Sequence, residues 1–277
     1  MDGDPEAAGH RWLVRFGYDG ADFAGWARQP RLPTVEGTVR DGIRSRRVVP
    51  PGAPVRVEVA SRTDRGVSAR ANVLALGSGL GAAELLHRLN AISPKLMFTA
   101  ATEAPAGFRV RRALRRVYRY FDPRPLERSS LAFRAGELLV GSVDARSFGR
   151  GFPAASPHWT TLESLHLRPE PGGLMIEVTA PAFVWGMVRK IVGALREVDA
   201  GRLSLERLEA AARGRSRLTL PLAEPEGLVL WDVEYPLRWE FRWAGPARLQ
   251  ERYLTGARKD LWRRSRVLAA LSGDRAE

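Results

Sequence analysis

The sequence contains no cysteine, which excludes disulfides, thiolate metal sites and cysteine nucleophiles. Histidine occurs only at His10, His87, His158 and His166, and none has the spacing of a metal-binding motif, so a zinc site is not expected. No apolar run approaches the roughly 20 residues that cross a bilayer, and the acidic first ten residues lack the apolar core of a signal peptide. These absences predict a cytoplasmic protein that does not bind a membrane.

Positive charge is in excess. The 277 residues include 44 Lys and Arg against 31 Asp and Glu, a formal net charge of +13. Such a surface attracts polyanions, so nucleic acid is the leading class of partner. Lysine occurs only at Lys95, Lys190 and Lys259, and the arginine that makes up the rest suits phosphates and base stacking. Codon bias in a G+C-rich genome accounts for much of the preference for arginine over lysine, but not for the net charge.

The first half of the chain predicts an α+β domain over residues 11–105. Thr34 is placed to cap a helix in which Val35, Val39 and Ile43 form one apolar stripe. Valines alternate with charged residues over 55–59, which indicates a strand. With strands at 11–18, 71–76 and 96–102 and a second helix at 82–91, the order is β-α-β-β-α-β, typical of a ferredoxin-like unit.

The turn residues Pro105-Ala106-Gly107 predict a boundary, and a second α+β domain follows over 106–236. Its expected elements are strands at 109–121, 160–167, 174–179 and 227–234, and helices at 183–200 and from Ser204. This half again mixes helices and antiparallel strands, so the fold class is α+β. Residues 237–277 form a basic extension with a helix predicted at about 246–271, and packing of its Trp239, Trp243 and Trp262 on the body is favoured over a dedicated RNA arm.

The segment Arg62-Thr63-Asp64-Arg65-Gly66-Val67 carries the main chemical signal. In extended backbone Arg62 and Asp64 point to the same side, because they are two residues apart. A guanidinium beside a carboxylate favours its ionised form, which a nucleophile or general base needs, and Gly66 permits the unusual dihedrals of a tight turn. Taken alone, this pattern is more typical of a surface ion pair than of an active site.

Six motifs in a fixed order make the pattern more specific. They are Tyr18-Asp19-Gly20, residues 23–30, residues 62–67, residues 115–120, residues 187–193 and Glu226-Gly227-Leu228. From about Arg11 to Pro236, this series resembles the TruA family of tRNA pseudouridine synthases. Ser68 stands where bacterial members usually have histidine, so the chain is more similar to the archaeal and eukaryotic branch.

The resemblance implies a pseudouridine synthase fold: two ferredoxin-like halves in a mixed, mostly antiparallel sheet flanked by helices, with an active-site cleft between the halves. It also implies a cofactor-free isomerase that converts uridine to pseudouridine. It implies that Asp64 is the catalytic aspartate and Arg62 its ion-pair partner. Tyr118 is expected to lie against the target base and to accept the proton that leaves C5. Arg189 is expected to reach Asp64, and Leu228 to line the uracil pocket.

The resemblance also implies tRNA as partner, recognised by shape across a homodimer, with flipping of a uridine in the anticodon stem-loop at roughly positions 38–40. The strand predicted at 109–121 would place alternate arginines on one face as a basic stripe. The expected RNA-binding residues are Arg28, Arg65, Arg109, Arg111, Arg115, Arg116 and Lys190.

Two other functions compete with this interpretation. One is a ferredoxin-like RNA-binding protein without catalysis. The other is a metal-dependent nuclease or phosphotransferase, in which Asp19, Asp22 and Asp64 would converge on a metal ion. Trp185 is either a core residue or a platform for RNA stacking, and the sequence does not decide between them.

Overall fold

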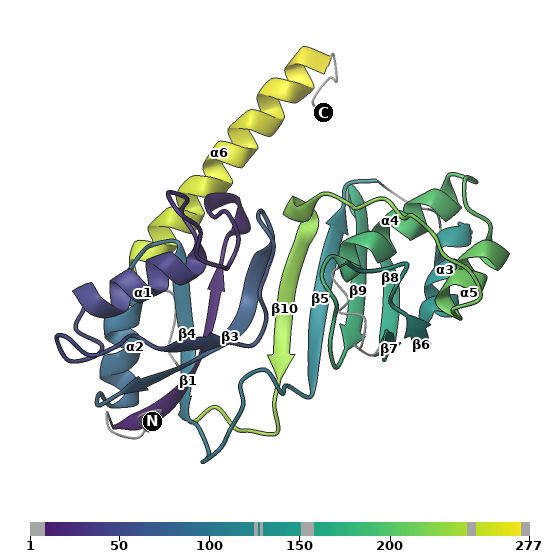
Figure 1. Cartoon of the computed structure of the whole chain (residues 1–277). Coiled ribbons are helices and arrows are strands. Elements are labelled where there is room, and N and C mark those ends of the chain that lie inside the picture. Colours follow the sequence, from purple (N-terminus) through teal and green to yellow (C-terminus); the bar gives the residue numbers. More distant parts are fainter. Residues whose placement is uncertain (1–8, 125–126, 128–129, 151–157, 243–247, 273–277) are drawn as a thin grey trace.

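The computed structural model describes residues 9–124, 127, 130–150, 158–242 and 248–272. Most strands join one nine-stranded sheet, and a separate pair, β6 (Gly141–Asp144) and β7 (Trp159–Leu162), forms a second small sheet. Helices flank the large sheet at both ends, and a long C-terminal helix projects from the body (Figure 1). The predicted α+β class with a mixed, mostly antiparallel sheet is confirmed.

The N-terminal half has the predicted β-α-β-β-α-β order. Its elements are β1 (His10–Tyr18), α1 (Val35–Ser45), β2 (Val57–Val59), β3 (Ser68–Ser78), α2 (Ala82–Asn90) and β4 (Leu96–Glu103). Their order in the sheet is β4-β1-β3-β2, which is the ferredoxin-like arrangement. Thr34 Oγ1 accepts the amide of Gly37 at the start of α1, and the predicted apolar stripe of this helix is fully buried.

The C-terminal half repeats this topology. Its main elements are β5 (Arg115–Asp122), α3 (Leu131–Leu139), β8 (Ser164–Glu170), β9 (Gly173–Ala180), α4 (Met187–Asp199), α5 (Leu205–Ala212) and β10 (Leu228–Glu234). The strands lie in the order β10-β5-β9-β8, which matches the first half strand for strand. The two halves join where β10 pairs in parallel with β3, with Val229 opposite Ser68 and Leu230 opposite Ala69.

Several predicted bounds differ from the structure, and two of these errors concern the site. Away from the site, the strand predicted at 160–167 is divided between β7 in the small sheet and β8 in the large one. The strand predicted from Arg109 begins only at Arg115, because residues 109–112 form a turn closed by a hydrogen bond from the amide of Arg112 to the carbonyl of Arg109. The helix predicted from Phe183 begins at Met187, because Gly186 before it has a φ of 74°, in the left-handed region. Residues 183–186 are therefore a loop.

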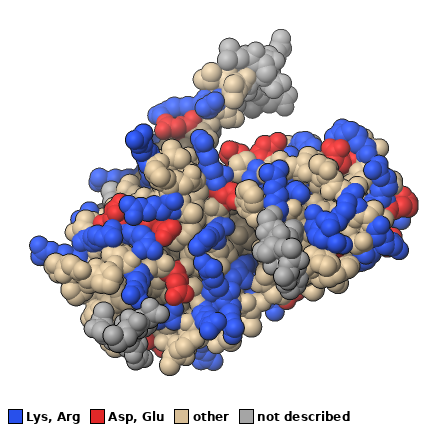
Figure 2. Space-filling view, in the orientation of Figure 1, with Lys and Arg blue, Asp and Glu red and all other residues tan. Residues whose placement is uncertain are grey.

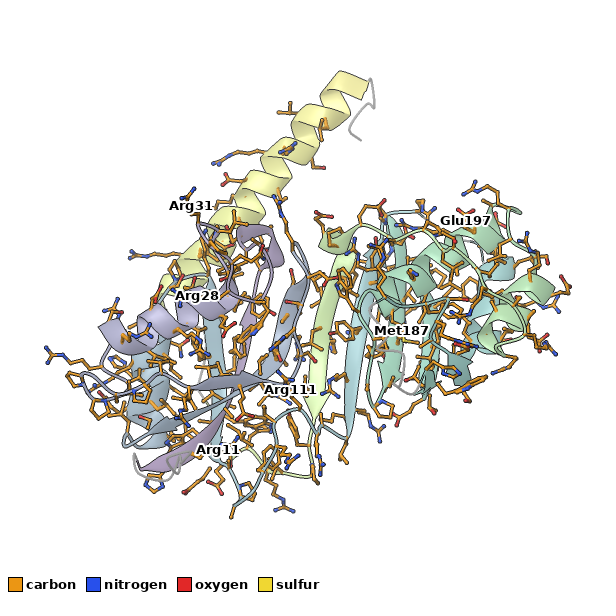
Figure 3. All side chains as sticks on the ribbon, in the orientation of Figure 1. Arg11, Arg28, Arg31, Arg111, Met187 and Glu197 are labelled. Atoms are coloured by element: carbon orange, nitrogen blue, oxygen red, sulfur yellow. The ribbon has the colours of Figure 1, made fainter. Side chains whose placement is uncertain are left out.

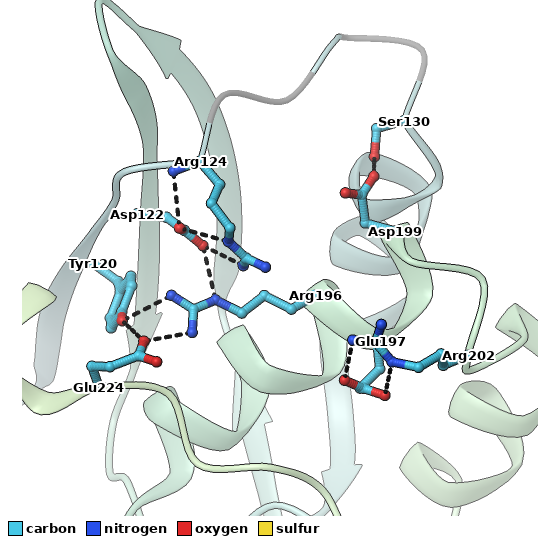
Figure 4. Close-up of polar contacts among 9 residues, drawn as sticks. All are labelled: Tyr120, Asp122, Arg124, Ser130, Arg196, Glu197, Asp199, Arg202 and Glu224. Carbon is cyan, nitrogen blue, oxygen red and sulfur yellow. Dashed lines mark hydrogen bonds and ion pairs between the residues drawn. The ribbon is translucent and has the colours of Figure 1, made fainter. Parts of the chain in front are cut away.

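A partly buried polar network connects β5 to α4 and to the segment before β10 (Figure 4). Arg196 on α4 donates to Asp122 (3.0 Å), to Glu224 (2.6 Å) and to the Tyr120 hydroxyl (3.2 Å). Burial alone would raise the pKa of Asp122, but hydrogen bonds from Arg124 and Arg196 outweigh it and lower the pKa to about 2. This network holds in place the chain that leads to Leu228.

The basic extension contains α6 (Arg248–Ser272), where a helix is predicted. Its first turns are attached to the body, since Gln250 donates to the carbonyls of Asn90 (2.9 Å) and Leu96 (3.0 Å), and the hydroxyl of Tyr253 donates to Asp22. Beyond these contacts, the helix projects from the body (Figure 1). Trp239 packs on the core as expected; Trp243 and the side chain of Trp262 lie outside the described residues.

Candidate active site

A cleft of about 970 Å³ lies where the two halves meet. The N-terminal half contributes residues from the loop at 24–32 and from 59–67, and the C-terminal half contributes residues from β5, the 182–189 segment and the start of β10. Asp64, Tyr118, Arg189 and Leu228 all line it. Four residues that are far apart in the sequence therefore share one cavity.

The backbone on either side of Asp64 is held firmly. The hydroxyls of Tyr18 and Thr63 are 2.7 Å apart, and the amide of Trp26 donates to the carbonyl of Thr63 over 3.0 Å. Gly25 has a φ of 101°, and a Cβ at this position would lie 3.2 Å from the carbonyl carbon of Asp64, so only glycine fits this approach without displacing the backbone. The loop at 24–32, which overlaps the second motif, thus supports the turn that carries Asp64.

Both oxygens of the Asp64 carboxylate are engaged from the C-terminal half. The indole Nε1 of Trp185 donates to Oδ1 over 2.6 Å, and the guanidinium of Arg189 lies 3.3 Å from Oδ2. The Asp64 side chain keeps 25% of its surface exposed, whereas Arg189 keeps 13%. A second bond, from Arg189 Nε to the carbonyl of Ala223 (2.6 Å), fixes the orientation of the guanidinium. The carboxylate is therefore held in position yet reachable from the cleft.

The expected ion pair between Arg62 and Asp64 is absent among the residues that the structure describes. Arg62 lines the cleft but its side chain is exposed, and the salt bridge to Asp64 comes from Arg189. The spacing of two residues places both side chains along one extended segment, but it does not bring their charged ends into contact.

Tyr118 and Leu228 form an apolar part of the cleft wall. They are 8% and 6% exposed, and the ring of Tyr118 packs edge-on against Phe183 with centroids 5.1 Å apart. Burial raises the pKa of Tyr118 to about 12, while Ser61 and the charge of Arg116 oppose the rise. The phenol is therefore protonated at neutral pH, and proton acceptance at this group requires that its own proton leave in the same step.

Arg116 is buried rather than exposed to RNA, against the prediction. It is 8% exposed, and its guanidinium donates to Ser61 Oγ (3.0 Å) and to the carbonyls of Ala60 (3.1 Å), Arg111 (2.7 Å) and Pro181. These acceptors belong to both halves of the molecule. Arg116 thus connects the two walls of the cleft.

Lys190 is also misplaced by the prediction. It is 9% exposed, and its ammonium group donates to the carbonyls of Ser147 (3.1 Å) and Gly149 (3.3 Å). Burial, together with the nearby charge of Arg150, lowers the pKa of Lys190. This lysine holds the segment after β6 against α4 and does not face solvent.

The other five predicted RNA-binding residues, Arg28, Arg65, Arg109, Arg111 and Arg115, are exposed. Arg65 and Arg111 line the cleft itself. In Figure 3, Arg28 lies on the N-terminal half near α6, and Arg111 lies between the two halves. Lys and Arg side chains are spread over both halves of the face in Figure 2.

The three aspartates of the nuclease hypothesis do not converge. Asp22 is bound to Lys95 (2.7 Å) and Tyr253, and Asp64 to Trp185 and Arg189. Across the described ranges, no group of three or more His, Cys, Asp or Glu side chains is placed to hold a metal ion. No described helix has both the length and the apolar character needed to cross a membrane.

Trp185 is the site residue that sequence reasoning did not assign. It is neither core nor part of a helix, since its side chain is 59% exposed and it precedes α4. The sequence signal that pointed to this residue was its place two residues before the motif at 187–193. Its contact with Asp64, 121 positions earlier, depends entirely on the tertiary fold.

Comparison with known proteins identifies similar proteins with one shared name. Residues 135–236 match a family model described as tRNA pseudouridine synthase. Three similar curated proteins carry the name tRNA pseudouridine synthase A. The protein of Thermococcus gammatolerans is 35% identical, and the alignment covers 94% of this chain and 97% of the relative. The proteins of Cutibacterium acnes and Frankia casuarinae are 34% and 36% identical, and each alignment covers 82% of this chain and 89% of the relative.

These relatives include archaeal and bacterial proteins, so they leave the predicted branch undecided. They align with 82–94% of the chain, and the family model spans most of the C-terminal half, which supplies Trp185, Arg189 and Leu228 to the cleft. The chain therefore belongs to the tRNA pseudouridine synthase A family, isomerases that convert uridine in tRNA to pseudouridine.

Proposed function

We propose that Asp64 is the essential carboxylate of this isomerase and that its substrate uridine enters the cleft as a flipped nucleotide. The observation that carries the proposal is the position of Asp64, held by Trp185 and Arg189 in the same cavity as Tyr118 and Leu228. An aspartate turned outward on a convex surface could not reach a base.

The reaction breaks the N1–C1′ bond, rotates the uracil and joins C5 to C1′, without redox chemistry. An ionised carboxylate can attack C1′, add to C6, or remove a proton at C2′, and each route needs a single aspartate. The guanidinium of Arg189, 3.3 Å from Oδ2, is the ion-pair partner of this carboxylate. After the new bond forms, the proton leaves C5 for the hydroxyl oxygen of Tyr118, and the phenolic proton of Tyr118 passes to solvent in the cleft in the same step, so that the neutral phenol is regenerated.

Extraction of the nucleotide from a stacked stem costs a few kcal/mol, which contacts in the pocket must offset. The Tyr118 ring and Leu228 supply an apolar surface of suitable size beside Asp64. The exposed cations Arg28, Arg65, Arg109, Arg111 and Arg115 are assigned to the phosphates around the target.

We assign the target to the anticodon stem-loop, at roughly positions 38–40, and the active form to a cytoplasmic homodimer that recognises tRNA by shape. The target position, the cellular location and the dimer rest on the family resemblance. Recognition by shape also follows from the A-form RNA helix, whose deep major groove offers little sequence information to a protein. Mapping of pseudouridine in tRNA from cells with and without the gene tests the target position, and light scattering of the purified chain tests the dimer.

The decisive test of the catalytic residue is Asp64→Asn, assayed by tritium release from tRNA labelled at C5 of uridine. Turnover is expected to disappear, while filter binding of tRNA stays within a few-fold of wild type. Retained turnover would refute the assignment of Asp64. Absence of turnover in the wild-type enzyme, with tRNA still bound, would favour the non-catalytic RNA-binding protein instead.

A further inference from the structure

We propose that Trp185 positions the catalytic carboxylate through its indole N–H while its exposed ring face stacks on a base of the bound RNA. This inference rests on the proposed function of Asp64 and deepens it. It assigns to one side chain both a role in the chemical step and a role in RNA binding.

The hydrogen bond to Asp64 is the first support. The distance of 2.6 Å between Nε1 and Oδ1 is short for a nitrogen donor, as expected for a bond to an ionised acceptor. Because Arg189 occupies the region of Oδ2, the two donors hold the carboxylate from two sides. Loss of either donor frees the carboxylate to rotate, and a nucleophile that is not held in its reactive orientation loses rate.

The loop that carries Trp185 is the second support. The amide of Arg150 donates to the carbonyl of Trp185 over 3.2 Å, and these two residues form an isolated β-bridge. On the other side, the left-handed backbone of Gly186 ends the loop at α4, and a Cβ there would lie 3.2 Å from the Leu222 side chain. The main chain next to the indole is thus held by a backbone hydrogen bond on one side and by the conformation of Gly186 on the other.

Exposure of the ring is the third support. An indole that served only the core would be buried, yet Trp185 is 59% exposed at the mouth of the cleft. Its cationic neighbour is the guanidinium of Arg150, 5.9 Å from the ring centroid. An exposed aromatic ring beside a cation is the arrangement that binds single-stranded bases by stacking, with the cation available for phosphate. A nucleotide next to the flipped uridine is unstacked on one side and needs such a surface.

Two substitutions separate the two roles. Trp185→Phe keeps an aromatic face but removes the donor. Trp185→His keeps an N–H at the equivalent atom of the five-membered ring but removes most of the stacking area. Both changes are at an exposed position, and thermal unfolding establishes that each variant folds. Single-turnover tritium release measures the chemical step, and filter binding of the same tRNA measures affinity.

Trp185→Phe is expected to lower the single-turnover rate about tenfold or more with affinity unchanged within about twofold, because a hydrogen bond to a charged group is lost. Trp185→His is expected to retain most of the rate at saturating tRNA but to bind tRNA about tenfold more weakly, because base stacking is lost. A residue that acted only on folding would move both quantities together in both variants.

A wild-type rate in Trp185→Phe would overturn the positioning role, and wild-type affinity in Trp185→His would overturn the stacking role. These outcomes are distinct from failure of the proposed function, in which the wild-type enzyme itself releases no tritium or Asp64→Asn retains turnover.

Discussion

Replacement of Arg116 tests whether this residue connects the halves of the cleft or binds RNA. Arg116→Met keeps an unbranched apolar side chain but removes four hydrogen bonds to Ser61, Ala60, Arg111 and Pro181. Hydrogen bonds from a charged donor stabilise by about 1.5–3 kcal/mol each, but removal of a buried charge recovers several kcal/mol of desolvation. We expect the free energy of unfolding to fall by about 2–4 kcal/mol.

Urea unfolding followed by tryptophan fluorescence measures this loss. At the slopes typical of small proteins, the midpoint should fall by about 1 M. Arg115→Met is the matched control, since Arg115 is the neighbouring residue, 47% exposed, with ion pairs to Glu163 (3.6 Å) and Glu234 (3.3 Å). Exposed pairs of this kind contribute at most about 1 kcal/mol, so the control should unfold almost as wild type does.

The salt dependence of tRNA binding completes the test. Each phosphate contact adds about one to the slope of log affinity against log salt concentration. Arg116→Met should leave this slope unchanged, whereas Arg115→Met should reduce it. Unchanged stability together with a reduced slope in Arg116→Met would refute the structural role and restore the RNA-binding prediction.

Three further outcomes are expected. Tyr118→Phe should reduce tritium release by about 100-fold or more, the usual contribution of a proton-transfer group, with tRNA affinity kept; a rate within about threefold of wild type would exclude Tyr118 as the acceptor. Asp122→Asn should lower the free energy of unfolding by about 2 kcal/mol at neutral pH, because the folded-state pKa of Asp122 is about 2, below its unfolded value. This contribution is complete above about pH 5 and is lost as the pH falls toward about 2, so the stability curves of variant and wild type should converge in acid, and parallel curves would contradict the reasoning. Treatment with EDTA should leave turnover intact in monovalent salt that keeps tRNA folded, since no cluster of potential metal ligands exists in the described ranges; loss of activity that only added metal restores would oppose this.

Most secondary structure follows from local patterns. Val35, Val39 and Ile43 at intervals of four predict α1, and alternation over 55–59 predicts a strand, although only Val57–Val59 pairs in the sheet. Elements with weaker signals were not predicted, among them α3 and the short strands β6 and β11 (Phe241–Arg242). These elements depend on tertiary contacts, which a single sequence does not display.

The sequence by itself determined the α+β class, the order of elements in the N-terminal half and the kinds of side chain at the site. Periodicity established that order, and the order of the motifs brought Asp64, Tyr118, Arg189 and Leu228 into one hypothesis. The structure brings those four side chains to one cleft.

Only the tertiary structure decided which arginine and lysine side chains are exposed and which are buried. Because side chains alternate along β5, Arg115 and Arg116 lie on opposite faces of the sheet. The alternation does not show which face is covered by other elements, and in the structure the covered face is the one that carries Arg116. Likewise, the indole of Trp185 reaches Asp64 because both halves contribute residues to one cleft. The two residues are 121 positions apart, and no local sequence pattern specifies the distance between side chains so far apart in the chain.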